Sequence, residues 1–193
     1  TRRAFLFGAA AAALPIPGVA GDGGAVETAR KALARFMSAP SLSGDFVQFS
    51  PRGPQREGKF SIERPGKARF DYAAPASLTV IADGRTVAVR NAKLGTWDLY
   101  PLAKTPMKLL LDDGLDAMSK AVRSAHDDGD LISVVLSDPA VFDRATVEIA
   151  FGSTDHILRQ WTVTDGRGEE TAFVVYGLEF GSKAAPSLEA ITA

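Results

Sequence analysis

The chain has 193 residues, of which 46% are hydrophobic and 23% are charged, and its formal net charge is −1. This length supports one well-buried domain and is too short for two large ones. The composition excludes disorder for most of the chain, because disordered chains carry fewer apolar residues. There is no cysteine. That excludes a disulfide scaffold, a thiolate metal site, a cysteine nucleophile and a lipid-attached cysteine.

The first twenty residues have the pattern of an export signal. Arg2 and Arg3 precede an apolar run over 4–14, which is shorter than the ~20 residues that span a bilayer, and Pro15 interrupts the pattern. Small residues just before position 21 offer a cleavage site, so we expect cleavage rather than a retained membrane anchor. The start resembles the twin-arginine signal of bacteria, although Phe7 stands where lysine is usual, and the Sec route stays open.

The residues that follow the signal, 21–193, are predicted to form a single periplasmic domain. Removing residues 1–20 leaves 20 basic and 23 acidic residues, a net charge of −3. The basic residues are interspersed with acidic ones, so the sequence predicts no basic surface that would bind the phosphates of a nucleic acid. We expect a monomer that has no nucleic acid as a partner.

The predicted elements begin with an amphipathic helix over residues 25–39, where apolar residues recur at intervals of three and four. The period then changes to two, which is typical of half-buried strands. Asp83-Gly84 and Pro65-Gly66 are the clearest hairpin signals between the runs. The first strands are predicted over 44–50, 56–64, 67–73, 77–82, 85–91 and 95–100.

A second helical pattern covers residues 105–121, with Thr105 as a capping hydroxyl and Pro106 at the first helical position. We expect two short helices there, broken near Gly114. Strands resume after them with the spacing of an antiparallel sheet rather than of βαβ units. They are predicted over 131–137, 146–152, 157–164 and 171–180.

Alternation within the strands indicates one wet face and one apolar face. Over residues 67–73, for example, Ala68, Phe70 and Tyr72 alternate with charged residues. A long curved sheet of this kind must have its apolar face covered, either by a second sheet or by the helical segments. Helices alone leave room for a ligand cavity. The pattern therefore predicts a mainly β, α+β fold of ten or eleven strands.

Catalytic and metal-binding motifs are missing from the sequence. His126 and His156 occur in no paired-histidine spacing, and there is no GxSxG elbow, Walker loop or GxGxxG. Asp127, Asp128 and Asp130 lack the spaced ligands and the terminal glutamate of a calcium loop, so solvated turns explain them better. We predict a protein that is not an enzyme and uses no metal or cofactor.

Several segments together resemble the periplasmic outer-membrane lipoprotein carrier proteins, the LolA family, over most of the chain after the signal. Each marker is weak alone, and their combination is specific. The markers are Phe46-Val-Gln48, Gly58-Lys-Phe-Ser-Ile-Glu-Arg64-Pro65-Gly66, Arg69-Phe-Asp-Tyr72, Pro75, Val80-Ile-Ala-Asp83-Gly84, Tyr100-Pro-Leu and Thr105-Pro-Met-Lys-Leu-Leu.

The resemblance implies an open half-barrel of about eleven antiparallel strands, lidded by short helices. It also implies a periplasmic carrier that accepts acylated lipoproteins and delivers them to the outer membrane, with the acyl chains held in an apolar cavity. The implied partners are those lipoproteins, an ATP-driven inner-membrane release complex of the LolCDE type, and an outer-membrane receptor of the LolB type or a substitute. The alternative is a periplasmic carrier or sensor of a free lipid on the same fold.

By the same resemblance, Arg64 ties the helical lid shut in the closed state. Its parity with Phe60 and Ile62 directs it inward, where its donors would satisfy carbonyl groups at the ends of the lid helices. Without the resemblance, a strand-end arginine that reaches water is the better interpretation.

The cavity wall is predicted partly from the resemblance and partly from parity. Each member is more often an ordinary core residue than a lipid contact, so the set carries more weight than its members. By resemblance the wall contains Ala68, Phe70, Tyr72, Val80, Val87, Val89 and Met107. Parity adds Phe46, Phe60, Ile62, Trp97 and Leu99.

One departure from the family concerns the C-terminal end, residues 185–193, which lacks the long Gly-Pro loop and extra strand of well-known members. Any safeguard against backward transfer that depends on that extension is therefore in doubt here. The lack of cysteine favours a carrier over the lipid-anchored receptor.

Overall fold

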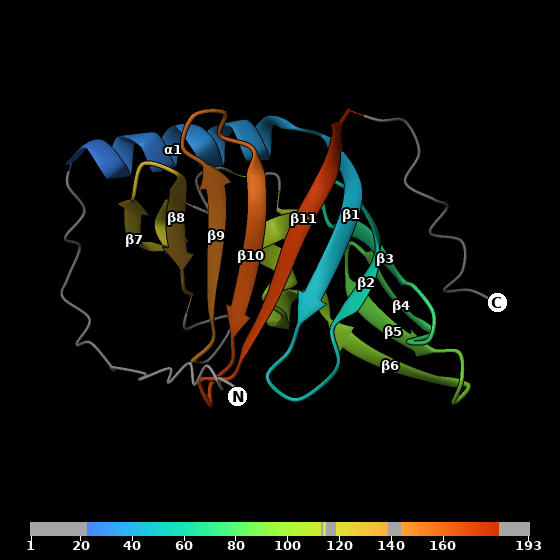
Figure 1. Ribbon diagram of the computed structural model, residues 1–193. Coiled ribbons are helices and arrows are strands. Elements are labelled where there is room, and N and C mark those ends of the chain that lie inside the picture. The colour runs from blue at the N-terminus through green and yellow to red at the C-terminus, as the bar shows by residue number, and fades with distance from the viewer. Residues whose placement is uncertain (1–22, 113, 115–118, 139–143, 182–193) are drawn as a thin grey trace, which may run out of the picture.

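The computed structural model describes residues 23–112, 114, 119–138 and 144–181. They form one eleven-stranded antiparallel sheet in the order β6-β5-β4-β3-β2-β1-β11-β10-β9-β8-β7, which curls around short helices (Figure 1). The predicted open, mainly β fold is therefore confirmed. The strands are β1 Ser41–Phe49, β2 Arg56–Glu63, β3 Lys67–Tyr72, β4 Leu78–Asp83, β5 Thr86–Asn91, β6 Thr96–Pro101, β7 Val122–Asp127, β8 Leu131–Leu136, β9 Thr146–Gly152, β10 Leu158–Thr164 and β11 Glu170–Phe180.

The helix α1, Gly23–Ser38, crosses the ends of several strands at the top of Figure 1. Its apolar stripe is buried, with Leu33 and Phe36 each 2% exposed, as the period of three and four predicts. The ring of Phe36 meets that of Phe151 edge to face at 5.9 Å, which fastens the helix to β9. Within the described part of the chain, no helix is long and apolar enough to cross a membrane.

The β4–β5 connection is the tight turn that Asp83-Gly84 predicts. Gly84 has a φ of +99°, and Asp83 Oδ1 accepts from the backbone N–H groups of Arg85 and Thr86 at 2.8 and 2.7 Å. These bonds hold the pKa of Asp83 below its usual range, the one from Thr86 contributing most. The β2–β3 turn spans residues 64–66, one residue more than the Pro65-Gly66 signal indicates.

The strand β7 is the main element that the sequence pattern missed. It contains His126 and Asp127, the second of which we assigned to a solvated turn, and only Ala125 of its residues is buried. Such a polar edge strand has no apolar alternation to reveal it. The second predicted helix falls largely on residues 115–118, and the predicted export signal over 1–20 also lies outside the described residues, as do residues 185–193.

Cross-strand register assigns each side chain to a face. Pairing of Phe60 with Phe70, Phe70 with Val80 and Val80 with Val89 puts these residues on one face, which is the concave one toward the helices. The core lies on that face and includes Phe46, Ile132, Val134, Leu136, Val147, Ile149 and Phe151, all 0% exposed.

Candidate functional site

An apolar cavity lies on the concave face beneath the short helix α2, Met107–Leu111. Its volume is about 230 Å³, somewhat below the usual range of ligand pockets, and it is partly open to solvent. Its walls come from five strands and from the helical segment. The lining residues are Phe70, Tyr72, Val80, Val87, Thr105, Pro106, Met107, Leu110, Trp161, Val163 and Phe173.

A glycine in β2 shapes the aromatic core beside this cavity. A Cβ on Gly58 would lie 2.7 Å from the ring of Phe46 and 2.3 Å from the backbone oxygen of Asp71, so only glycine fits. The Phe46 ring therefore reaches across β2 and meets Tyr72 edge to face at 5.0 Å. It lies 6.0 Å from the ring of Phe173 on the other side. The aromatic wall is continuous because β2 carries no side chain at this point.

Five of the predicted wall residues line the cavity, and four more lie in the core of the same face. Val89 is half-buried on this face, two residues from Val87 along β5. The five that line it are Phe70, Tyr72, Val80, Val87 and Met107. The four in the core are Phe46, Phe60, Ile62 and Ala68.

Trp97 and Leu99 are not part of this wall, so their parity assignment is wrong. Leu99 pairs with Ala88 and Trp97 pairs with Arg90, which puts both on the convex face. They are 63% and 39% exposed respectively, and the Arg90 guanidinium lies 5.6 Å from the centre of the Trp97 ring. β6 is an edge strand exposed on both faces, so an apolar residue at alternate positions does not indicate the buried side there.

Three wall residues on β10 and β11 were absent from the predicted set, namely Trp161, Val163 and Phe173. Register pairs Trp161 with Phe173 on neighbouring strands, and their rings stack at 5.1 Å. The alternation of Trp161 and Val163 was a usable signal. The sequence did not predict how strongly the open sheet curls, and this curl brings β10 and β11 opposite α2.

The cover of the cavity is short and continues directly from β6. The 3₁₀ turn η1, Leu102–Lys104, leads into α2. The prediction that Thr105 caps α2 is wrong, because its hydroxyl donates back to the Leu102 carbonyl at 2.9 Å. Pro106 precedes the helix at its N-cap position rather than opening it. Met107 and Leu110 face the cavity.

Arg64 is buried between the two helices, with 9% of its surface exposed. Its Nη1 donates to the Ala39 carbonyl just beyond α1 at 2.9 Å, and its Nη2 donates to the Leu110 carbonyl in α2 at 3.1 Å. The guanidinium also lies 4.4 Å from the centre of the Phe36 ring. Burial lowers the pKa of Arg64 to about 10.

A backbone contact adds to this junction, since the N–H of Gly66 donates to the Leu111 carbonyl at 2.8 Å. The end of α2 therefore has two carbonyls satisfied from the β2–β3 turn. The five-residue helix is therefore held by these polar contacts at its C-terminal end and by the buried side chains of Leu109, Leu110 and Leu111, while Met107 and Leu110 line the cavity.

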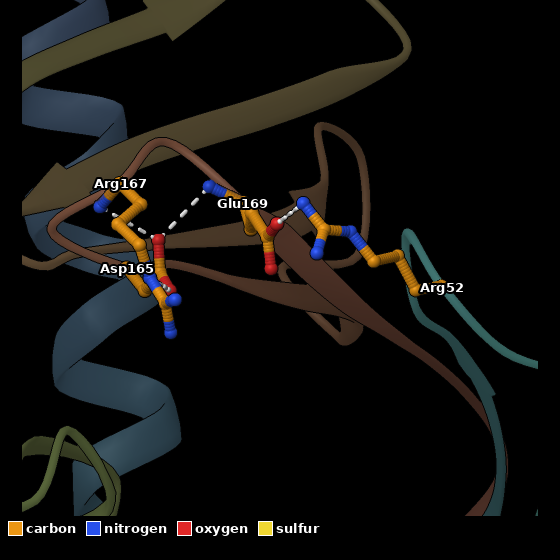
Figure 2. A network of polar contacts seen from close by, with 4 residues as sticks. All are labelled: Arg52, Asp165, Arg167 and Glu169. Atoms are coloured by element: carbon orange, nitrogen blue, oxygen red, sulfur yellow. Dashed lines mark hydrogen bonds and ion pairs between the residues drawn. The ribbon is translucent and has the colours of Figure 1, made fainter.

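At the end of the sheet away from Arg64, the β1–β2 loop and the β10–β11 turn form a more polar rim. Burial raises the pKa of Tyr72 to about 12, and the nearby Arg56 charge opposes that shift. Figure 2 shows Arg52, from the β1–β2 loop, paired with Glu169 beside the β10–β11 turn. In the same view Asp165 Oδ1 accepts from the N–H groups of Arg167 and Glu169 at 2.8 and 3.0 Å. These bonds lower the pKa of Asp165, the one from Glu169 contributing most.

The described residues contain no group of three histidine or acidic side chains that could hold a metal ion. His126 lies on β7 and His156 in the turn before β10, where its φ is +54°. The site is therefore described by its apolar walls, its helical cover and its buried arginine.

Comparison with known proteins agrees with this architecture. The family model for the outer membrane lipoprotein carrier protein LolA matches residues 37–189. An outer-membrane lipoprotein carrier protein of Chromobacterium violaceum is 29% identical over 150 residues, 74% of this chain and 72% of that protein. The corresponding protein of Chromohalobacter salexigens is 28% identical over 176 residues, 86% and 81% of the two chains.

A putative outer membrane lipoprotein-sorting protein domain from Vibrio parahaemolyticus has a similar fold, with a TM-score of 0.50 and 8% identity. The match covers 84% of this chain and 94% of that one, and it concerns the fold alone. The sheet, the cavity and the Arg64 junction thus coincide with a family match over most of the described residues. The chain belongs to the LolA family of outer membrane lipoprotein carrier proteins.

Proposed function

We propose that this protein is a periplasmic carrier that holds the acyl chains of lipoproteins in the concave cavity while they pass from the inner to the outer membrane. The observation that carries the proposal is an apolar cavity covered by a short helix that polar contacts hold at one end. In this proposal the apolar side chains of the cavity shield the acyl chains from water and α2 moves to admit them, and no covalent bond is made or broken.

The energetic need for such a carrier is large. Three acyl chains of roughly fifteen methylenes each, at ~0.8 kcal/mol per methylene, represent on the order of 36 kcal/mol of apolar exposure. A carrier must nevertheless bind more weakly than the final membrane, or it would never be emptied. Loading therefore needs work, which we assign to an ATP-driven inner-membrane complex, with release to an outer-membrane receptor or a substitute.

The cavity in this conformation is too small for three acyl chains. If a methylene takes the ~30 Å³ of a water molecule, three such chains need about 1,300 Å³. The cavity together with the open space at its mouth offers about 690 Å³, so three chains enter only if α2 moves away from the sheet. Arg64 and Gly66 hold α2 in place, so loading must break or shift these contacts. Arg64 is then the group that favours the closed state and helps to expel cargo.

A second candidate is a carrier of a free lipid. One chain of fifteen methylenes needs about 450 Å³ on the same measure, which is less than the 690 Å³ of the cavity and the open space at its mouth. A single-chain lipid would bind there with α2 unmoved, whereas a triacylated cargo requires displacement of the helix. Movement of α2 therefore separates the two candidates.

The experiment uses the absence of cysteine from the sequence. A Met107→Cys variant carries one environment-sensitive fluorophore on α2, and a Leu94→Cys variant carries it on the turn before β6, where Leu94 is 72% exposed. A triacylated lipopeptide is expected to change the Met107 signal saturably and leave the Leu94 signal constant. A lipopeptide that is not retained without detergent, and that changes neither signal, would contradict the carrier proposal.

A further inference from the structure

An unpaired polar group lies on the concave face where β1 ends. Gln48 is only 9% exposed, and its Oε1 has no hydrogen-bond partner among the described residues. Its Nε2 is engaged, donating to Ser50 Oγ at 2.9 Å. A buried amide oxygen without a partner is destabilising, whereas an apolar side chain of the same shape would be nearly neutral. The residue therefore suggests a ligand that supplies a donor.

Register places Gln48 beside the cavity. Its cross-strand neighbours are Phe173 on β11 and Arg56 on β2, and facing residues on paired strands share a face of the sheet. Phe173 lines the cavity itself. Gln48 thus lies at the edge of the apolar wall, next to the half-buried residue Arg56.

This edge is at the far end of the strands from the Arg64 junction. Arg64 follows Arg56 by eight positions, about 25 Å along an extended strand. A second hollow of about 510 Å³ adjoins Arg56 and is lined by residues 54–57 and 73–76. Arg56 is one of its lining residues, so it contacts the hollow and neighbours Gln48.

We infer that Gln48 and Arg56 bind the polar junction of an N-acylated lipoprotein, where the acyl chains join the polypeptide. This inference rests on the proposed carrier function and names the part of the cargo that is recognised. The acyl chains lie in the cavity, the first residues of the polypeptide lie toward the second hollow, and the junction lies between them.

The chemistry of the two side chains fits that junction. The amide that joins an acyl chain to the N-terminus of the polypeptide carries an N–H, which Gln48 Oε1 accepts. The glycerol esters carry carbonyl oxygens, which the Arg56 guanidinium donates to. The glycerol esters of a phospholipid offer acceptors and no N–H donor, and any donors of its head group lie beyond the phosphate. Gln48 therefore favours a lipoprotein over a phospholipid whose ester junction occupies the same place, because a site with a buried polar group rejects a ligand that leaves it unpaired.

The test compares three probes on the mature protein: a tripalmitoylated cysteinyl lipopeptide, its analogue with an N-methylated palmitoyl amide, and dipalmitoyl phosphatidylcholine, which has no hydrogen-bond donor. We expect the wild-type protein to prefer the N–H lipopeptide over the N-methyl analogue by roughly tenfold. In Gln48→Met the two lipopeptides should bind equally, with affinity for the phospholipid unchanged. Met has nearly the shape of Gln and lacks the acceptor, so the fold should be retained.

The matched control is Ser61→Ala. Ser61 is 7% exposed and its Oγ has no partner among the residues described, yet it belongs to the convex face because it pairs with Arg69. This variant should keep the tenfold preference.

The outcomes separate this inference from the proposed function. Equal binding of both lipopeptides by the wild-type protein, a comparison that needs no variant, overturns the role of Gln48 and leaves the carrier proposal standing. The same holds if Gln48→Met keeps the wild-type preference. Failure of the wild-type protein to bind either lipopeptide overturns both.

Discussion

The concave face of the sheet has two halves, and they are covered in different ways. In the α1 half, β7–β10, the sixteen-residue helix packs against a core in which Val134, Ile149 and Phe151 are fully buried. In the α2 half, β2–β6, a five-residue helix covers half-buried Val80 and Met107 around a cavity. Both covers contribute to the hydrophobic core, since Leu109, Leu110 and Leu111 of α2 are also buried, but the α2 cover is one short helix that lies over a cavity. The comparison indicates which half can open without unfolding the protein.

The largest expected effect is in the α1 half. Phe151→Ala should lower the free energy of unfolding by about 3–5 kcal/mol, because it removes a fully buried ring and the Phe36 contact. Met107→Ala, the matched truncation in the α2 half, should cost about 1 kcal/mol or less, since Met107 is half-buried beside empty space. Urea denaturation measures both. Equal losses would show that the two covers do not differ.

The next effect concerns the packing of Phe46 against Gly58, in the aromatic core beside the cavity. Gly58→Ala should destabilise the protein by about 1–3 kcal/mol, because its Cβ would overlap the Phe46 ring and the Asp71 oxygen. The displaced ring would also weaken lipopeptide binding. Gly53→Ala is the control, since nothing lies within 4 Å of a Cβ at that position. Denaturation curves that coincide for the two variants would contradict the described packing.

Arg64 tests whether the α2 cover favours release. Arg64→Leu removes the bonds to the Ala39 and Leu110 carbonyls, which destabilises the closed state. The variant should still bind lipopeptide, about tenfold more tightly, and transfer it more slowly to acceptor vesicles or receptor. Arg64→Lys keeps the charge without the forked pair of donors and should show an intermediate effect. Normal handover by Arg64→Leu would contradict this role.

The smallest expected effect is in the β4–β5 turn of the α2 half. Asp83→Asn should lower stability at pH 7 by under about 0.5 kcal/mol, because the carboxylate is exposed. The pKa of Asp83 is depressed, so its contribution is present above the unfolded value of 3.8 and is lost as the pH falls through the folded value. The difference between the proteins should therefore disappear in acid. A difference that grows below pH 3.8 would contradict the assigned bonds.

The sequence pattern was informative where strands have one buried face. Alternation assigned Phe70 and Tyr72 to the apolar face, whereas the family resemblance assigned them to the cavity wall that they line. The turn residues marked the β4–β5 hairpin. Alternation failed at both edges of the sheet, at Trp97 on β6 and at the polar strand β7, because an edge strand has no single buried side. The period alone does not reveal which strands are at the edges.

Contacts between distant segments were less predictable for a different reason. Parity indicated that Arg64 points inward, but its bond to the Leu110 carbonyl depends on where α2 lies over the sheet. The position of Trp161 and Phe173 opposite that helix depends on the curl of all eleven strands. Gln48 belongs to one of the family markers, but the sequence did not assign it to the cavity, since a polar residue on an apolar face becomes notable only when its oxygen is seen to lack a partner.

The most direct test of the carrier account is to recover the mature protein from the periplasm without detergent and identify what is bound at one-to-one stoichiometry by mass spectrometry. The account predicts acylated lipoproteins, which should then pass to outer-membrane vesicles. Free phospholipid, or another lipid with no attached polypeptide, would contradict it and assign the cavity to a lipid carrier or sensor.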